Sequence, residues 1–264
     1  MVPFLLKPCK QFYKVDIRDF KEYTTTSTRS LISKIWHVDI RKTSSSPYLI
    51  CRIETFRREQ NDNNMEQSEL GLWSKLAMIN DDVTLLLDNY GNPVEVINRE
   101  ELGKKAKATF VSIRESFDGE IIDKLLVDVD AVYNDASLLL FELNAYNQFG
   151  LLTPCLYNND FNTISRDKRL NLREVAYKTD IKECFTLKDA DEGFIHFDMV
   201  GIAKNVEENL QKIDTCCGAF TFDTKNFSMH KANVDITYST PDYKKTLSYK
   251  LQALSDKDME YLGY

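Results

Sequence analysis

The most informative segment of the sequence is Val83–Phe117, VTLLLDNYGNPVEVINREELGKKAKATFVSIRESF. Apolar residues recur at every second position over Val83–Leu87, which predicts a strand with one buried face. Asn89–Pro93 follows with turn chemistry, because Gly91 adopts positive φ at little cost. Val94–Ile97 then predicts the return strand of a hairpin.

A helix is expected directly after this hairpin. Asn98 is a suitable N-cap, because its side-chain oxygen can accept a hydrogen bond from the free amides of the first turn. Glu101 stands three residues later, as in a capping box. One helical face is apolar and consists of Leu102, Ala106, Phe110, Ile113 and Phe117. The segment therefore predicts a strand–turn–strand–helix unit.

Composition bounds the class of protein. The chain of 264 residues is 43% hydrophobic, which is enough for the core of one large domain or two small ones. Its net charge of -7 disfavours nonspecific binding to nucleic acid or to anionic membranes. No apolar run approaches the roughly 20 residues of a membrane span, and Phe4–Leu6 is too short for a signal-peptide core. We expect a cytoplasmic protein, or a periplasmic one if a signal sequence was removed.

The six cysteines show no C-x-x-C pair. Adjacent Cys216 and Cys217 cannot bridge to each other without distorted geometry. Cys51 lies among apolar strand residues, where a thiol behaves as a small hydrophobe. We expect reduced structural thiols; metal or redox chemistry is the alternative, and the spacing that supports it is missing.

The longest predicted helix covers Glu120–Leu143. Its apolar stripe has spacings of three and four residues and consists of Ile122, Leu125, Val129, Val132, Ala136, Leu139 and Leu143. Leu126, Tyr133 and Leu140 widen the stripe beyond a two-helix seam. We expect the sheet to grip this helix as a buried element, and an exposed docking face is the alternative.

The segment after this helix, Tyr146–Phe161 (YNQFGLLTPCLYNNDF), interrupts the helical pattern with Gly150 and Pro154. Two interpretations stay open: a loop folded onto the core, and a rim that lines a binding opening. Under the second interpretation the ligand- or partner-binding residues are its four aromatic residues, Tyr146, Phe149, Tyr157 and Phe161.

Alternating apolar residues predict strands on both sides of the helical part. The expected organisation is a single domain, 1–264, in which strand-rich halves at 10–97 and 174–254 flank a helical core at 98–148. The fold class is α+β, with a strongly curved antiparallel sheet, a half-barrel, wrapped around central helices. Arg57–Asn64 is expected to be a surface loop, and Glu207–Ile213 a short helix.

The order of a strand meander, LDNYGNPVEVINREEL at Leu87–Leu102, helices, and GAFTFDTKNFSMHKANVDITY at Gly218–Tyr238 resembles bacterial lipoprotein-like domains of the LolA/LolB half-barrel type. The resemblance covers most of the chain as a pattern of turns and alternation. It implies a curved antiparallel sheet that grips a helical plug, and a lipid-carrying role. This sequence departs from those families because it shows no signal sequence or lipobox.

The P-loop, dinucleotide-binding, zinc-protease, nucleophile-elbow and EF-hand signatures do not occur. His37 with Asp39 and His196 with Asp198 form two His-x-Asp pairs, whose members share a strand face. Half-buried strands place polar residues in this way, so we expect no metal and no cofactor; metal binding at these pairs is the alternative.

A small basic cluster is formed by Arg166, Lys168, Arg169 and Arg173. On an acidic chain such a cluster indicates a solvated face. Nucleic-acid binding is the alternative, and the interleaved aromatic residues that would favour it are missing.

These observations favour a non-catalytic binding protein that holds a protein partner or an apolar ligand, without nucleic acid. A bacterial secretion-system accessory or a toxin-neutralising immunity protein fits, because such proteins are often acidic, single-domain and free of catalytic motifs. The alternative is a cofactor-free enzyme with a pocket in the half-barrel. Converging polar groups with shifted pKa values would favour the enzyme, and an apolar groove would favour binding.

Overall fold

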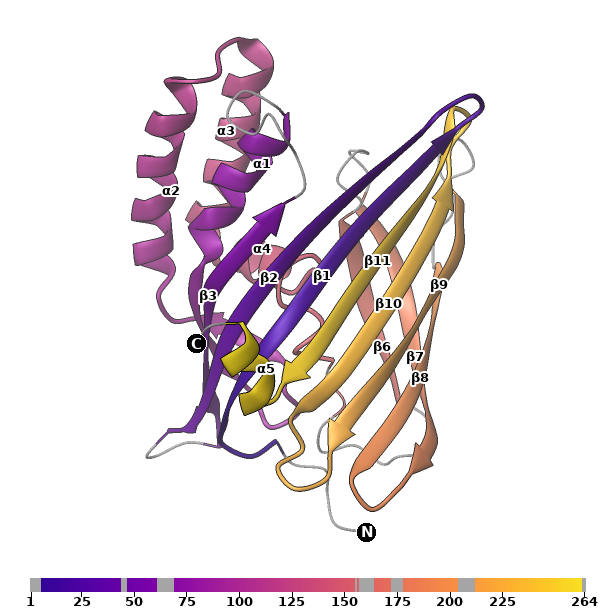
Figure 1. The fold of residues 1–264 in the computed structure, drawn as a ribbon. Helices are drawn as coiled ribbons and strands as arrows, with labels where there is room; N and C mark the ends of the chain where they lie inside the picture. Colours follow the sequence, from indigo (N-terminus) through magenta and orange to yellow (C-terminus); the bar gives the residue numbers. More distant parts are fainter. Residues whose placement is uncertain are drawn as a thin grey trace.

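The computed structural model describes residues 6–43, 47–60, 69–154, 156, 164–171, 178–203 and 212–262. Within these residues, eleven strands form one antiparallel sheet in the order β5-β4-β3-β2-β1-β11-β10-β9-β8-β7-β6 (Figure 1). The strands are β1 (Cys9–Tyr23), β2 (Ser27–Lys42), β3 (Leu49–Gln60), β4 (Asp82–Leu87), β5 (Pro93–Val96), β6 (Ile164–Asn171), β7 (Lys178–Ala190), β8 (Phe194–Ala203), β9 (Lys212–Asp223), β10 (Met229–Ser239) and β11 (Tyr243–Leu254).

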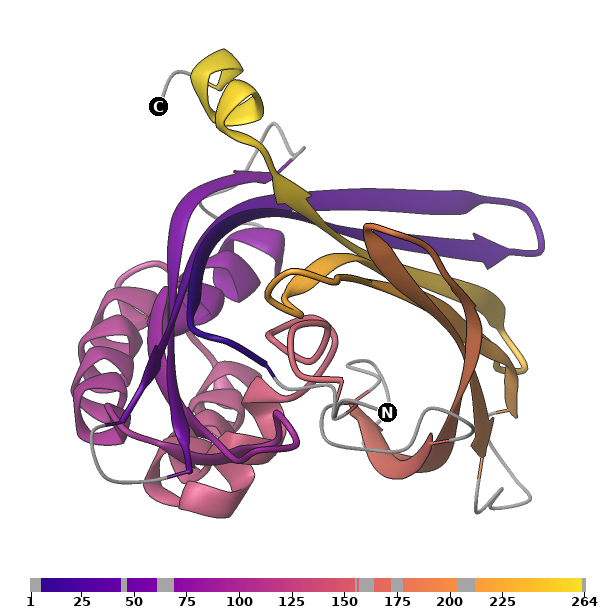
Figure 2. The same ribbon diagram turned by 90° about the horizontal axis from the view of Figure 1, so that it is seen from below.

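The sheet is curved and open. β1 pairs with β11 from Phe12↔Leu254 to Tyr23↔Tyr243, which joins the strands of the N-terminal part to those of the C-terminal part. β5 and β6 are the two edges of the sheet. Seen from below, the two ends of the sheet bend toward each other (Figure 2). The predicted α+β class with a curved antiparallel sheet is confirmed.

Helices α1 to α4 lie together at the β5 end of the sheet (Figure 1). The helical elements are α1 (Glu69–Ala77), the 3-10 turn η1 (Met78–Asn80), α2 (Arg99–Arg114), α3 (Glu120–Asn134), α4 (Ala136–Leu143) and α5 (Asp256–Tyr261). In the described part of the chain, no helix combines the length and apolar character that a membrane span requires. The centre of the concave face is occupied by the chain that follows α4, residues 144–154 (Figure 2). We call this segment the plug loop.

The predicted strand–turn–strand–helix unit is confirmed as β4, β5 and α2. Gly91 has the expected positive φ, 77°. The capping role of Asn98 is wrong, because its side chain makes no hydrogen bond to the first turn of α2. Its Oδ1 instead accepts from the Thr84 amide at 2.9 Å, and its Nδ2 donates to the Asp82 carbonyl at 3.0 Å. Asn98 therefore fastens the start of α2 to strand β4.

We expect Asn98→Ala to lower the free energy of unfolding by about 1–3 kcal/mol, because it removes two intramolecular hydrogen bonds of about 0.5–1.5 kcal/mol each. Asn98→Asp is the matched control, because it keeps the acceptor for Thr84 and loses the donor for Asp82. Urea denaturation at neutral pH measures both variants. An Asn98→Ala midpoint equal to that of the wild type would show that these two bonds contribute nothing.

The single helix predicted over Glu120–Leu143 is wrong. Asp135 has extended dihedral angles (φ -108°, ψ 119°) and separates α3 from α4. Its carboxylate accepts hydrogen bonds from the Ser137 and Leu138 amides, so it is the N-cap of α4.

The break also moves the buried face of the helices. In α3 the buried side chains are Leu126 and Tyr133, which were expected at the edges of the stripe. The expected centre of the stripe, Ile122, Leu125, Val129 and Val132, is only partly buried, and Ala136 is exposed.

Two smaller expectations also fail. β3 continues to Gln60, so the first part of Arg57–Asn64 is strand and not loop. β9 begins at Lys212, so the end of Glu207–Ile213 is strand and not helix. The remaining residues of both segments lie outside the described part of the chain.

Candidate functional site

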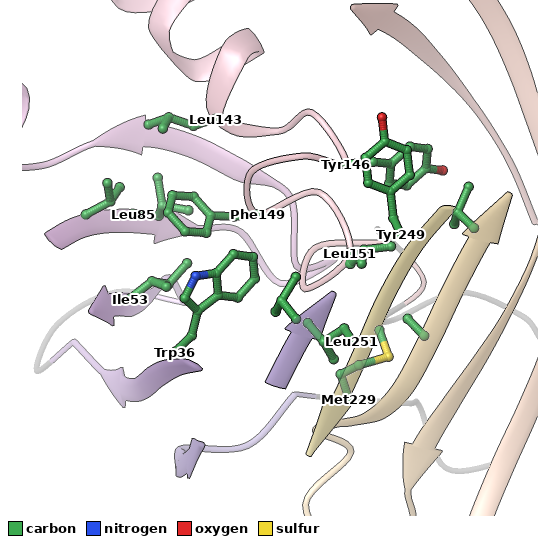
Figure 3. Close-up of a cluster of buried hydrophobic side chains, with 14 of the residues drawn as sticks. Trp36, Ile53, Leu85, Leu143, Tyr146, Phe149, Leu151, Met229, Tyr249 and Leu251 are labelled. Atoms are coloured by element: carbon green, nitrogen blue, oxygen red, sulfur yellow. The ribbon is translucent and has the colours of Figure 1, made fainter. Parts of the chain in front are cut away.

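The concave face of the sheet carries two apolar walls. Alternation along the strands directs every second side chain to this face. Trp36, Ile53 and Leu85 on β2 to β4 form one wall, and all three are buried. The opposite wall is formed on β10 and β11 by Met229, Tyr249 and Leu251 (Figure 3). The two walls face each other across the plug loop.

The plug loop fills the space between these walls. The Phe149 ring centroid lies 5.1 Å from that of Trp36, and the Tyr146 centroid lies 5.8 Å from that of Tyr249. Leu151 is fully buried. One loop thus packs against both walls at once (Figure 3).

The structure places two of the four predicted binding aromatics. Tyr146 and Phe149 are 3% and 2% exposed, so in this structure they face the core and not the solvent. Tyr157 and Phe161 lie outside the described residues. Contact of these four residues with a ligand stays a prediction.

The backbone of the plug loop is hydrogen-bonded to itself and to the end of α4. Within the described residues, its backbone-to-backbone bonds all run between Leu140 and Leu152, and include Phe149 N to Leu143 O at 3.0 Å. Gly150 closes the turn so tightly that a Cβ atom there would lie 2.3 Å from the Asn144 carbonyl oxygen. The loop is a compact unit, and in the described residues it makes no backbone-to-backbone bond to a strand of the sheet.

A buried polar cluster holds the loop to β6 and β7. Arg166 and Glu183 are register partners on these strands, and the Arg166 Nε–H donates to the Glu183 carboxylate. The Tyr146 hydroxyl donates to the same carboxylate. The Arg166 Nη1–H donates to the Thr153 carbonyl at 2.9 Å. Both ends of the plug loop therefore contact one ion pair.

The surroundings of this ion pair are apolar. The Phe185 ring lies 5.3 Å from the Arg166 guanidinium carbon, and Glu183 is completely buried. Burial raises the pKa of the Glu183 carboxyl to about 8. The Arg166 guanidinium opposes this shift, since a neighbouring positive charge favours the ionised form. The β8 register partner of Glu183 is Gly201, which brings no charge.

This raised pKa predicts a pH-dependent stability. Between pH 5 and 8 the folded chain retains a proton on Glu183 that the unfolded chain releases, so stability falls as pH rises. We expect the unfolding free energy of the wild type, relative to Glu183→Gln, to fall by about 1–2 kcal/mol over this range, since one pKa unit is about 1.4 kcal/mol and Arg166 opposes the shift. Urea denaturation at several pH values measures the difference. A difference that grows with pH would contradict a raised pKa.

In the part of the chain that the structure describes, a small cavity lies beside the plug loop. A cavity of about 10 Å³ lies next to Leu152 and Thr153, and its other walls include Tyr13, Val38 and Met229. This volume holds about one water molecule. A larger ligand at this place requires the plug loop to move.

The sequence pattern did not reveal this polar cluster. The basic run around Arg166 indicated a solvated face, and the structure contradicts this, because the Arg166 side chain is only 12% exposed. The side chains of Lys168 and Arg169 and the whole of Arg173 lie outside the description. Glu183 could have been found by alternation, because Ile181 and Phe185 flank it on the same buried face.

The two His-x-Asp pairs have other partners. His37 Nδ1 lies 3.3 Å from Glu54, and Asp39 pairs with Arg41. His196 Nδ1 lies 3.1 Å from the Thr221 hydroxyl, and its Nε2 lies 3.7 Å from Asp191. Among the described residues, no three His, Cys, Asp or Glu side chains are grouped as metal ligands.

Comparison with known proteins gives weak likenesses. No protein-family model and no curated protein matches the sequence. Solved structures that it resembles include DynF of the dynemicin biosynthesis pathway of Micromonospora chersina, with 7% identity over 98% of this chain and 87% of that chain and a TM-score of 0.23. A DUF1329 family protein from Desulfovibrio piger has 11% identity over 94% and 88%, with a TM-score of 0.18.

A third structure is described as an outer membrane lipoprotein-sorting protein domain from Vibrio parahaemolyticus. Its identity is 8% over 95% of this chain and 90% of that chain, and its TM-score is 0.15. At such low TM-scores the likeness does not establish a shared family.

Proposed function

We propose that this protein is a non-catalytic binding protein that holds an apolar ligand in the concave face of its half-barrel sheet. The observation that carries the proposal is that an irregular loop fills the space between two apolar walls. A loop in that position is unusual, because buried loops normally leave backbone groups unsatisfied. Among the described residues, the backbone bonds of this loop run within it and to α4, so it can leave the concave face without breaking a backbone bond to the sheet.

If a ligand takes the place of the plug loop between the two walls, the energetics favour an apolar ligand. When the plug loop moves, Trp36 and Tyr249 lose their contacts with Phe149 and Tyr146. An apolar ligand restores the burial of both walls, at roughly 25 cal/mol per Å² of apolar surface. The ligand then replaces the packing contacts that the plug loop makes with the two walls.

A protein partner that inserts an apolar segment into the same face would use the same exchange. The secretion-system accessory and the immunity protein are narrower proposals of this kind, supported by the net charge of -7 and by the absence of a catalytic motif from the sequence. The five described cysteines are free thiols. This supports the proposed cytoplasmic location.

Binding of N-phenyl-1-naphthylamine, a neutral apolar fluorophore, tests the proposal. We expect saturable binding by the wild type. Phe149→Leu should bind about three- to tenfold more tightly, because it weakens the closed position of the loop and so raises the fraction of open protein. Phe56→Leu is the control, because Phe56 is half exposed on β3. If neither the wild type nor Phe149→Leu binds the fluorophore, the proposal is refuted. Equal affinities for the wild type and Phe149→Leu would refute the role of the loop.

One observation favours an enzyme as a second candidate. Glu183, Arg166 and Tyr146 converge, and burial raises the pKa of Glu183 to about 8, a value suited to general acid–base work. If the protein is an enzyme, the wild type should change a bound ligand chemically, and the Glu183→Gln variant should leave it unchanged. Mass spectrometry of ligand recovered from both proteins separates the two candidates.

A further inference from the structure

We propose that the ligand is a long-chain carboxylic acid whose head group binds between Arg166 and Glu183 when the plug loop leaves. This inference rests on the proposed function and adds the chemical class of the ligand to it. It follows from what the plug loop contributes to the polar cluster.

The plug loop gives the ion pair one acceptor and one donor. The Thr153 carbonyl accepts from Arg166, and the Tyr146 hydroxyl donates to Glu183. Departure of the loop removes both hydrogen bonds together. Buried polar groups that lose their partners destabilise the open state, so a ligand that restores both bonds binds in preference to one that restores neither.

A carboxylic acid supplies this pair of groups on a single carbon atom. Its carbonyl oxygen accepts from the Arg166 guanidinium, as the Thr153 carbonyl does in this structure. Its hydroxyl donates to the Glu183 carboxylate, as the Tyr146 hydroxyl does. A methyl ester has no donor, and an alkylammonium has no acceptor and adds a second positive charge beside Arg166.

The charges balance in such a complex. In the complex the two carboxyl groups share one proton, so one negative charge faces the positive charge of the guanidinium. The proton is either carried in by the acid or held by Glu183, whose pKa burial already raises to about 8. No charge remains buried without its counterion.

Apolar side chains line the concave face beside this head-group position. Phe185 lies against the Arg166 guanidinium, and Tyr249 lies against Tyr146. From Tyr249 the wall continues along β11 to Leu251, opposite Trp36 (Figure 3). The chain would take the place that Phe149 and Leu151 now occupy.

Displacement of bound N-phenyl-1-naphthylamine by hexadecanoic acid, its methyl ester and hexadecylamine tests the inference, with each competitor below its aggregation concentration. We expect the acid to bind at least tenfold more tightly than the ester, and the amine to bind most weakly. In Glu183→Gln and Arg166→Lys the advantage of acid over ester should fall to about threefold or less. Glu54→Gln, on β3, should retain it.

The outcomes separate the two proposals. An ester or amine that binds as tightly as the acid overturns the carboxylic-acid inference and leaves apolar binding intact, as does an acid preference that persists in both variants. Absence of fluorophore binding refutes the proposed function itself. Comparison of the acid, the ester and the amine on the wild-type protein tests the carboxylic-acid inference even if a variant does not fold.

Discussion

Replacement of Arg166 by methionine is expected to lower the free energy of unfolding by about 3–5 kcal/mol at pH 8.5, because it leaves the buried Glu183 charge without its partner. The wild-type guanidinium also donates to the Thr153 carbonyl, so the variant loosens the plug loop as well. At pH 5 the cost should be smaller, since a protonated Glu183 needs no counterion. Urea denaturation at the two pH values measures both effects.

Two controls make this result specific. Arg114 pairs with Asp123 on the surface, with both side chains more than half exposed, and Arg114→Met should change stability by no more than about 1 kcal/mol. The double variant Arg166→Met/Glu183→Met should recover much of the loss, because paired replacement of a buried ion pair is often nearly neutral. A single Arg166→Met variant as stable as the wild type at pH 8.5 would show that Glu183 is not ionised in a closed site.

Replacement of Phe149 by alanine is expected to lower the free energy of unfolding by about 3–5 kcal/mol, the usual cost of truncating a buried phenylalanine. Phe149 is 2% exposed and packs against Trp36, so truncation leaves a cavity between the loop and the wall. Phe56→Ala is the matched control, because Phe56 is 50% exposed and should cost less than about 1 kcal/mol. A small effect of Phe149→Ala would mean that the plug loop is not part of the core in solution.

Local patterns predicted much of the sheet. The apolar residues at every second position over Val83–Leu87 and the turn residues around Gly91 are short-range signals. The strand and the turn that they predict are both present in the structure. The break at Asp135 was also encoded locally, because Asp is one of the preferred N-cap residues. It was missed because the apolar spacing continues through it.

The candidate site was harder to predict, because its contacts join residues far apart in the chain. Tyr146 meets Glu183 and Tyr249, and nothing in the sequence near Tyr146 indicates those partners. The same aromatic residues serve a rim or a plug equally well, and only the curvature of the sheet decides between them. Arg166 shows the same limit, since a basic run usually indicates a surface.

Hydrogen exchange of residues 144–154, with and without saturating N-phenyl-1-naphthylamine, tests the central claim that the plug loop occupies the ligand site. In the free protein these amides should exchange slowly, because the loop is buried. With ligand bound they should exchange faster, while the amides of β10 and β11 remain protected. Loop amides that stay equally protected, or become more protected, when the ligand binds would contradict the account.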